Sequence, residues 1–139
     1  MSSDLQVADK RVTTRDAMVA GMDPVAMPGR FVFKTLGDDC GSAGDLTAAI
    51  GMFREPEGVS VIIPASEGAD LVMAQITLNV HSALDGVGLT AAVSGALAEA
   101  GIPCNIVAAH HHDHVFVPEK DAPAALETLR DLANDRGGR

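Results

Sequence analysis

The stretch Thr-Leu-Asn-Val-His-Ser-Ala-Leu-Asp-Gly-Val-Gly-Leu at residues 77–89 constrains the fold of this chain more than any other. Apolar and polar residues alternate over residues 74–80, and a period of two is typical of a half-buried strand. Over residues 87–100 the apolar residues change to helical spacing, at Leu89, Val93, Ala96, Leu97 and Ala100. The sequence therefore predicts a strand, a glycine-bearing turn and a helix in direct succession.

The turn between this strand and helix has the features of a small ligand site. Asp85 can cap the first helical turn, and Gly101 followed by Pro103 ends the helix. The first N–H groups of a helix have no partner inside it and lie at its positive end. Gly86 and Gly88 let a ligand approach that backbone closely. The same residues also fit a plainer interpretation, in which the glycines only make the turn.

The rest of the chain supplies further strands around this unit. A strand at 102–109, a turn at 110–113, a strand at 114–117 and a helix capped by Asp121 follow the first helix. Residues 74–134 therefore spell five of the six elements of a split β-α-β unit, without its last strand. Earlier runs rich in apolar and β-branched residues predict strands at 30–36, 50–54 and 59–63. These strands have little helix of their own, so we expect one α+β body in which they complete the second sheet.

Composition limits the partners of this chain. Hydrophobic residues make up 47% of its 139 residues and aromatic residues only 3%, so its core must be aliphatic. A net charge of −9 argues against nucleic acid and against an anionic membrane surface. The N-terminus lacks the basic and apolar regions of a signal peptide, and Cys40 and Cys104 form no CxxC pair. We therefore expect a cytoplasmic protein with free thiols and with no nucleic-acid or membrane partner.

Several motifs together carry a resemblance to a known family. Leu-Asp-Gly-Val-Gly-Leu at 84–89, then a helix, then Ala-Gly-Ile-Pro-Cys-Asn-Ile at 100–106 resembles an ACT domain. More narrowly, the chain resembles small bacterial stand-alone ACT-like proteins over about residues 20–134. The segments that carry this narrower resemblance are Pro-Gly-Arg-Phe-Val-Phe at 28–33, Val-His-Ser-Ala-Leu-Asp-Gly-Val-Gly at 80–88 and His-Asp-His-Val-Phe-Val-Pro at 112–118. One departure is Val87, which stands where many ACT turns have proline.

The resemblance implies a ferredoxin-like (ACT) β-α-β-β-α-β architecture, with two ACT-like halves packed as one body. We expect the halves at residues 28–72 and 73–134, after a partly flexible N-terminal segment at 1–27 and before a tail at 135–139. The resemblance also implies a homodimer that binds an amino acid or a similar small molecule. It implies no cofactor and no catalytic residue.

The predicted ligand site lies between the turn and the strand expected beside it. The amides of residues 86–88 would receive a carboxylate, while Asp85 holds an amino group. Asn105 is disfavoured inside a strand and needs a hydrogen-bond partner, for which a neighbouring backbone group is the alternative. The candidate ligand-binding residues are Asp85, Gly86, Val87, Gly88, Leu89, Asn105 and Ile106.

The run His-His-His-Asp-His at 110–114 is a candidate metal site. Alternation puts His110, His112 and His114 on one side of an extended chain, and a His-x-His pair can bind a metal ion. Three histidines on a flat strand are nevertheless too spread for one ion, and the resemblance places this run at a hairpin turn, where local hydrogen bonds are usual. We therefore assign no metal ligand.

Three functions remain open from the sequence. The preferred hypothesis is a non-enzymatic regulatory protein that binds a small molecule. The second is a metal-binding protein or metal-dependent enzyme that uses the run at 110–114, and the third is a purely structural dimerising module. His81 and Ser82 do not form a nucleophile and base, because adjacent strand residues point apart and no Gly-x-Ser-x-Gly elbow is present.

Overall fold

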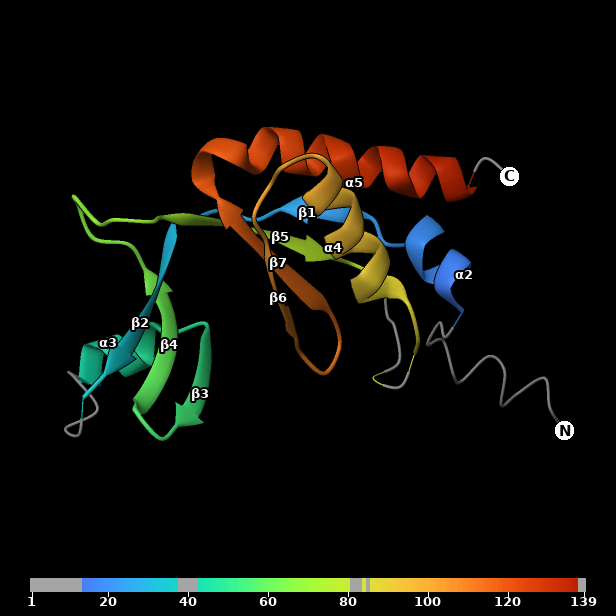
Figure 1. Ribbon diagram of the computed structural model, residues 1–139. Coiled ribbons are helices and arrows are strands. Elements are labelled where there is room, and N and C mark those ends of the chain that lie inside the picture. Colours follow the sequence, from blue (N-terminus) through green and yellow to red (C-terminus); the bar gives the residue numbers. More distant parts are fainter. Residues whose placement is uncertain (1–13, 38–42, 81–83, 85, 138–139) are drawn as a thin grey trace, which may run out of the picture.

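The structure is a computed structural model that describes residues 14–37, 43–80, 84 and 86–137 (Figure 1). The strands predicted at 30–36, 50–54 and 59–63 and the helix predicted at 87–100 are confirmed, with ends within one or two residues of the expected positions. In chain order the elements are α2 (Arg15–Ala20), β1 (Pro24–Ala26), β2 (Phe31–Leu36), α3 (Ala43–Ala48), β3 (Gly51–Glu55), β4 (Gly58–Pro64), β5 (Met73–Leu78), α4 (Leu89–Glu99), β6 (Asn105–Ala108), β7 (Asp113–Pro118), the 3-10 helix η1 (Glu119–Asp121) and α5 (Ala122–Gly137).

The described strands form an antiparallel sheet in the order β3-β4-β2-β5-β7-β6, with β1 also beside β5. A first half (β2, α3, β3, β4) and a second half (β5, α4, β6, β7) repeat the same β-α-β-β succession. Each half also orders its strands alike, as β3-β4-β2 and as β6-β7-β5. Figure 1 shows the halves as two lobes that meet where the start of β2 pairs with the start of β5. The expected ferredoxin-like fold with two similar halves is confirmed.

The last strand of the second half comes from the N-terminal side of the chain. β1 pairs antiparallel with β5, with Pro24 opposite Leu78 and Ala26 opposite Ile76. The sequence pattern did not predict this strand. Proline donates no backbone hydrogen bond, but it is tolerated at the first residue of an edge strand. β1 thus precedes the strands at 30–63 that we expected to complete this sheet, and it supplies the missing strand of the second β-α-β-β-α-β unit.

The main core lies between the second-half sheet and the helices α2, α4 and α5, which gather on one face of it (Figure 1). Alternation along β5 is confirmed, because Ile76 and Leu78 are buried in this core. α4 buries Leu89, Val93 and Leu97 against it. α5 adds its own buried stripe and continues to Gly137, beyond the point where we expected a tail. No helix in the described part of the chain is long and apolar enough to cross a membrane.

The first half has a smaller core of its own. Leu36 of β2 and Val61 and Ile63 of β4 are buried together, with Ala49 packed beside them. The segment before Ala49 forms the short helix α3. β3 lies at the outer edge of this half, and its residues 52–55 are exposed.

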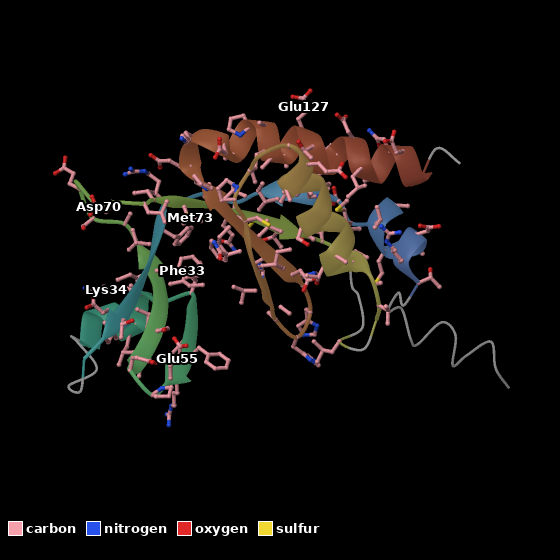
Figure 2. All side chains as sticks on the ribbon, in the orientation of Figure 1. Phe33, Lys34, Glu55, Asp70, Met73 and Glu127 are labelled. Atoms are coloured by element: carbon pink, nitrogen blue, oxygen red, sulfur yellow. The ribbon has the colours of Figure 1, made fainter. Side chains whose placement is uncertain are left out.

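Aromatic and apolar side chains join the two halves. Phe31 of β2 pairs in register with Met73 of β5, and both are buried with Phe116 of β7. The ring of Phe116 meets Phe33 edge to face at 5.4 Å between centroids. Figure 2 shows Phe33 and Met73 at this junction. Beside it, an apolar cavity of about 170 Å³ lies between the helix-free face of the first half and Val107 of β6. The halves are therefore one packed body.

Candidate ligand-binding site

The N-cap residue of the helix α4 has no side chain that could cap it. Its N-cap is Gly88, which has a φ of +106°, and the first helical hydrogen bond runs from the Ala92 N–H to the Gly88 carbonyl at 2.9 Å. Asp85, the residue that we expected to cap this helix, lies outside the described residues. The structure thus keeps the expected order of strand, glycine turn and helix. The left-handed conformation at Gly88 explains why glycine is needed there.

The short helix α2 covers this turn from the N-terminal side. A Cβ added at Gly88 would lie 2.8 Å from Cγ and 2.9 Å from Cδ of Arg15. Met18, one turn along α2, is buried in the main core and also lines the cavity beside the turn. A segment with little sequence signal therefore forms part of the wall of the candidate site.

A cavity of about 150 Å³ lies where the turn, α2, α4 and the β6–β7 hairpin meet. Of the predicted site residues, Gly86, Gly88 and Leu89 line it, whereas Val87 is 77% exposed and does not. Among the described residues, the lining is Met18, Leu84, Gly86, Gly88, Leu89, Thr90, Ala108, Ala109 and Asp113. A larger depression of about 350 Å³ between the end of α2 and the end of α5 is open and contains none of the predicted residues.

The other two predicted residues, Asn105 and Ile106, do not line this cavity. Asn105 pairs with Phe116 and is exposed on the face of the sheet that no helix covers. Ile106 points the opposite way and packs against the main core. The cavity meets β6 only at Ala108, the last residue of the strand, whereas Asn105 and Ile106 lie toward its other end. Successive strand residues alternate between faces, so the side chains of Asn105 and Ile106 cannot both contact the same ligand in one copy.

Asp113 is a cavity residue that the sequence did not single out. It is the first residue of β7 and pairs with Ala108 of β6 and Leu78 of β5. Burial raises the pKa of its carboxyl group, although the neighbouring His114 and His112 oppose that shift. The sequence placed Asp113 in a histidine-rich turn. The sequence signal that could have identified Asp113 is the position of an acidic residue at the start of a buried strand.

His114 takes part in a polar group on the other face of the sheet. Its Nδ1 lies 3.0 Å from Thr77 Oγ1 and 3.2 Å from Gln75 Nε2. Thr77 is buried although no helix covers it. Burial lowers the pKa of His114, and His112 lowers it further, whereas Asp113 raises it. This imidazole is therefore engaged in the sheet rather than free to ligate a metal.

The histidines at 110–112 lie in the β6–β7 turn. The ring centroids of His110 and His111 are 4.8 Å apart, and those of His111 and His112 are 6.3 Å apart. Nδ1 of His112 is buried and has no hydrogen-bond partner among the described atoms. Within the described residues, no three His, Cys, Asp or Glu side chains are grouped so as to hold a metal ion.

The chain thus has a repeated β-α-β-β fold, with a cavity where the glycine turn meets the neighbouring strands. The ACT-domain family model matches residues 58–131, and a second ACT-domain model matches residues 12–76. The chain belongs to the ACT-domain family. The two matches together span both halves of the molecule.

Solved structures are similar to this one over most of the chain. A Vibrio cholerae protein of unknown function, described as a possible transport protein, is 38% identical with a TM-score of 0.69, over 82% of this chain and 92% of its own. An Agrobacterium tumefaciens protein is 18% identical (TM-score 0.61; 79% and 87% covered). The regulatory subunit of aspartate kinase from Thermus flavus is 12% identical (TM-score 0.55; 78% and 95% covered). The last two show the fold alone. No curated protein sequence matches the chain.

Proposed function

We propose that this protein is a non-enzymatic regulator that binds an amino acid or a similar small zwitterion in the cavity beside the glycine turn. The observation that carries the proposal is the cavity itself, which has Gly86 and Gly88 on one side and the end of β6 on the other. Membership of a family of regulatory domains supports the same function. The free thiol of Cys104 supports a cytoplasmic location.

Backbone N–H groups at the start of α4 would bind the carboxylate of the ligand. Free amides at a helix N-terminus attract an anion by roughly 0.3–2 kcal/mol, and charge-assisted hydrogen bonds strengthen the contact. We retain Asp85 and Val87 in the proposed site as members of the same turn. Asn105 and Ile106 lie outside the cavity of one copy, so we retain them only for an assembly in which a second copy brings its β6 to this cavity.

A thermal-shift screen of the twenty standard amino acids and common small carboxylates tests this function. A ligand at about 100 times its Kd stabilises the fold by about 2.7 kcal/mol. For a chain of this size the unfolding midpoint should rise by roughly 5–15 °C. If no compound shifts the midpoint at millimolar concentration, the binding function is rejected in favour of a structural module.

We further propose that the protein is a homodimer. β3 is an edge strand with two large apolar side chains in water, since Met52 is 55% and Phe53 is 72% exposed. An apolar edge strand of this kind favours pairing with another chain, and a second copy offers the same surface across a two-fold axis. The Ala-rich α4 is the alternative contact, with Ala91, Gly95 and Ala98 exposed along it.

Light scattering of the wild type and of Phe53→Lys at tens of micromolar tests this assembly. We expect a wild-type mass of twice 14.3 kDa and a shift toward 14.3 kDa in the variant. A 14.3 kDa wild type would contradict the dimer, and a dimeric variant would place the contact elsewhere, with α4 the next surface to mutate.

A further inference from the structure

We propose that Asp113 supplies the negative charge of the ligand site and restricts it to small molecules that carry a cationic amino group. This inference rests on the proposed binding function and names the residue that sets the specificity of that site. The sequence hypothesis gave the same role to Asp85. Asp113 lies in the wall of the described cavity, whereas Asp85 lies outside the described residues.

The position of Asp113 is fixed by the sheet rather than by a flexible turn. Asp113 pairs with Ala108 on one side and with Leu78 on the other, so strands hold its backbone on both sides. Leu78 belongs to the main core, and cross-strand partners share a face, so Asp113 lies on the helix-covered face. There it meets Gly86, Gly88 and Thr90 around one cavity. A rigid element presents a binding group more accurately than a loop does.

The electrostatics of the cavity favour a cation. Asp113 is the only charged residue in the described lining. Among the described residues, no side chain forms a hydrogen bond or a salt bridge with its carboxylate. The imidazoles of His114 and His112 act electrostatically on its carboxyl group, and the ring of His114 is hydrogen-bonded on the other face of the sheet. A partly desolvated carboxylate without a hydrogen-bond or salt-bridge partner is stabilised when a ligand brings an ammonium group to it.

The size of the cavity and its second polar surface narrow the ligand further. The cavity of about 150 Å³ is smaller than the roughly 300–1,000 Å³ of a typical pocket for a drug-sized ligand. A ligand that fits this cavity has few non-hydrogen atoms. Its ammonium group would lie at Asp113, and its carboxylate would lie at the amides that begin α4. The geometry therefore points to a small amino acid rather than to its deaminated analogue.

The test compares each amino acid that binds the wild type with the 2-hydroxy acid of the same skeleton, by thermal shift and calorimetry on the full chain. Three matched variants are measured with it: Asp113→Asn, Asp85→Asn and Asp70→Asn. Asp70 is an exposed residue near the end of β7 opposite to Asp113 (Figure 2) and serves as the control. Circular dichroism verifies that each variant is folded.

We expect the 2-hydroxy acid to bind at least tenfold more weakly than the amino acid. Asp113→Asn should weaken amino-acid binding by about ten- to hundredfold, as expected for a charged hydrogen bond, while Asp70→Asn leaves it unchanged. If amino acids bind the wild type and Asp113→Asn binds them equally well, this inference is overturned and the binding function stands. If only Asp85→Asn loses affinity for the amino acid, the residue that binds the ammonium group is Asp85 in the turn, and the inference for Asp113 is overturned. If no amino acid binds the wild type, both proposals fail together.

Discussion

The hydroxyl oxygen of Thr77 lies 3.0 Å from Nδ1 of His114, on the face of the second-half sheet that no helix covers. The amide nitrogen of Gln75 lies 3.2 Å from the same ring nitrogen. An amide nitrogen can only donate, so Nδ1 accepts from Gln75 and the imidazole proton is on Nε2. Protonation of Nδ1 would place two donors against each other. The hydrogen bonding therefore agrees in direction with the lowered pKa that burial causes at His114.

Acidification should reduce stability through His114. Its pKa is lowered in the folded protein, so the unfolded chain takes up the proton first. The contribution of His114 to the free energy of unfolding is complete above its ordinary pKa of about 6.5. It is lost as the pH falls from that value through the pKa of His114 in the folded protein. Urea unfolding at several values between pH 7.5 and 5 should show a smaller pH dependence in His114→Gln than in the wild type. Equal slopes in the two proteins would contradict this assignment.

The carboxyl of Asp113 should have the opposite pH dependence. Burial raises its pKa, so the protonated form is favoured in the folded protein, and this contribution is lost as the pH rises through the folded pKa. At neutral pH the ligand-free protein therefore carries a desolvated charge. Asp113→Asn should melt at the wild-type temperature or above it when no ligand is present. A clearly lower melting temperature in differential scanning calorimetry would mean that Asp113 has a structural partner.

Gly88 and Gly95 make a matched pair. Gly88→Ala should destabilise the protein by about 1–2 kcal/mol, because alanine is strained at φ +106° and its Cβ would overlap Arg15. Gly95 lies inside α4 with no atom within 4 Å of an added Cβ, so Gly95→Ala should stabilise by roughly 0.5–1 kcal/mol. Chemical denaturation measures both. A neutral Gly88→Ala would show that the turn relaxes easily, and it would then be the better variant for testing ligand entry.

Phe116 should matter far more than Phe53 for stability. Phe116 is 2% exposed and touches the rings of Phe31 and Phe33 from the other half, so Phe116→Ala should cost about 3–5 kcal/mol. Phe53 is 72% exposed, and Phe53→Ala should change the stability of a single chain by less than about 0.5 kcal/mol. Equilibrium unfolding followed by circular dichroism gives both values. Similar losses in the two variants would mean that β3 is covered in solution.

The histidines of the β6–β7 turn should be dispensable for folding. Replacing His110, His111 and His112 by Gln should leave the folded structure and the response to amino acids intact, because none of them belongs to the described cavity wall. Untagged protein purified without chelator should contain less than one zinc per chain by elemental analysis. Stoichiometric zinc, with lower stability in the triple variant, would restore the metal-binding hypothesis.

The sequence by itself determined the elements of the second half. Period two over 74–80 and helical spacing over 87–100 depend on neighbours within one element, and these patterns follow directly from the geometry of strands and helices. The ferredoxin-like order of the second half followed from those elements, whereas its repetition in the first half was implied only by the resemblance to ACT domains. The turn glycines Gly86 and Gly88 were found the same way, because their conformational freedom is a local property.

Only the tertiary structure decided which residues meet. β1 completes the second sheet although its sequence begins with Pro24. Pairing with the edge of β5 stabilises a strand that local propensity alone would not predict. Asp113 enters the cavity and Asn105 does not, because strand register sets the face and level of each side chain. Register depends on contacts between segments far apart in the chain. A single sequence records the pattern along each strand, and the partners of that strand are chosen only when the whole core packs.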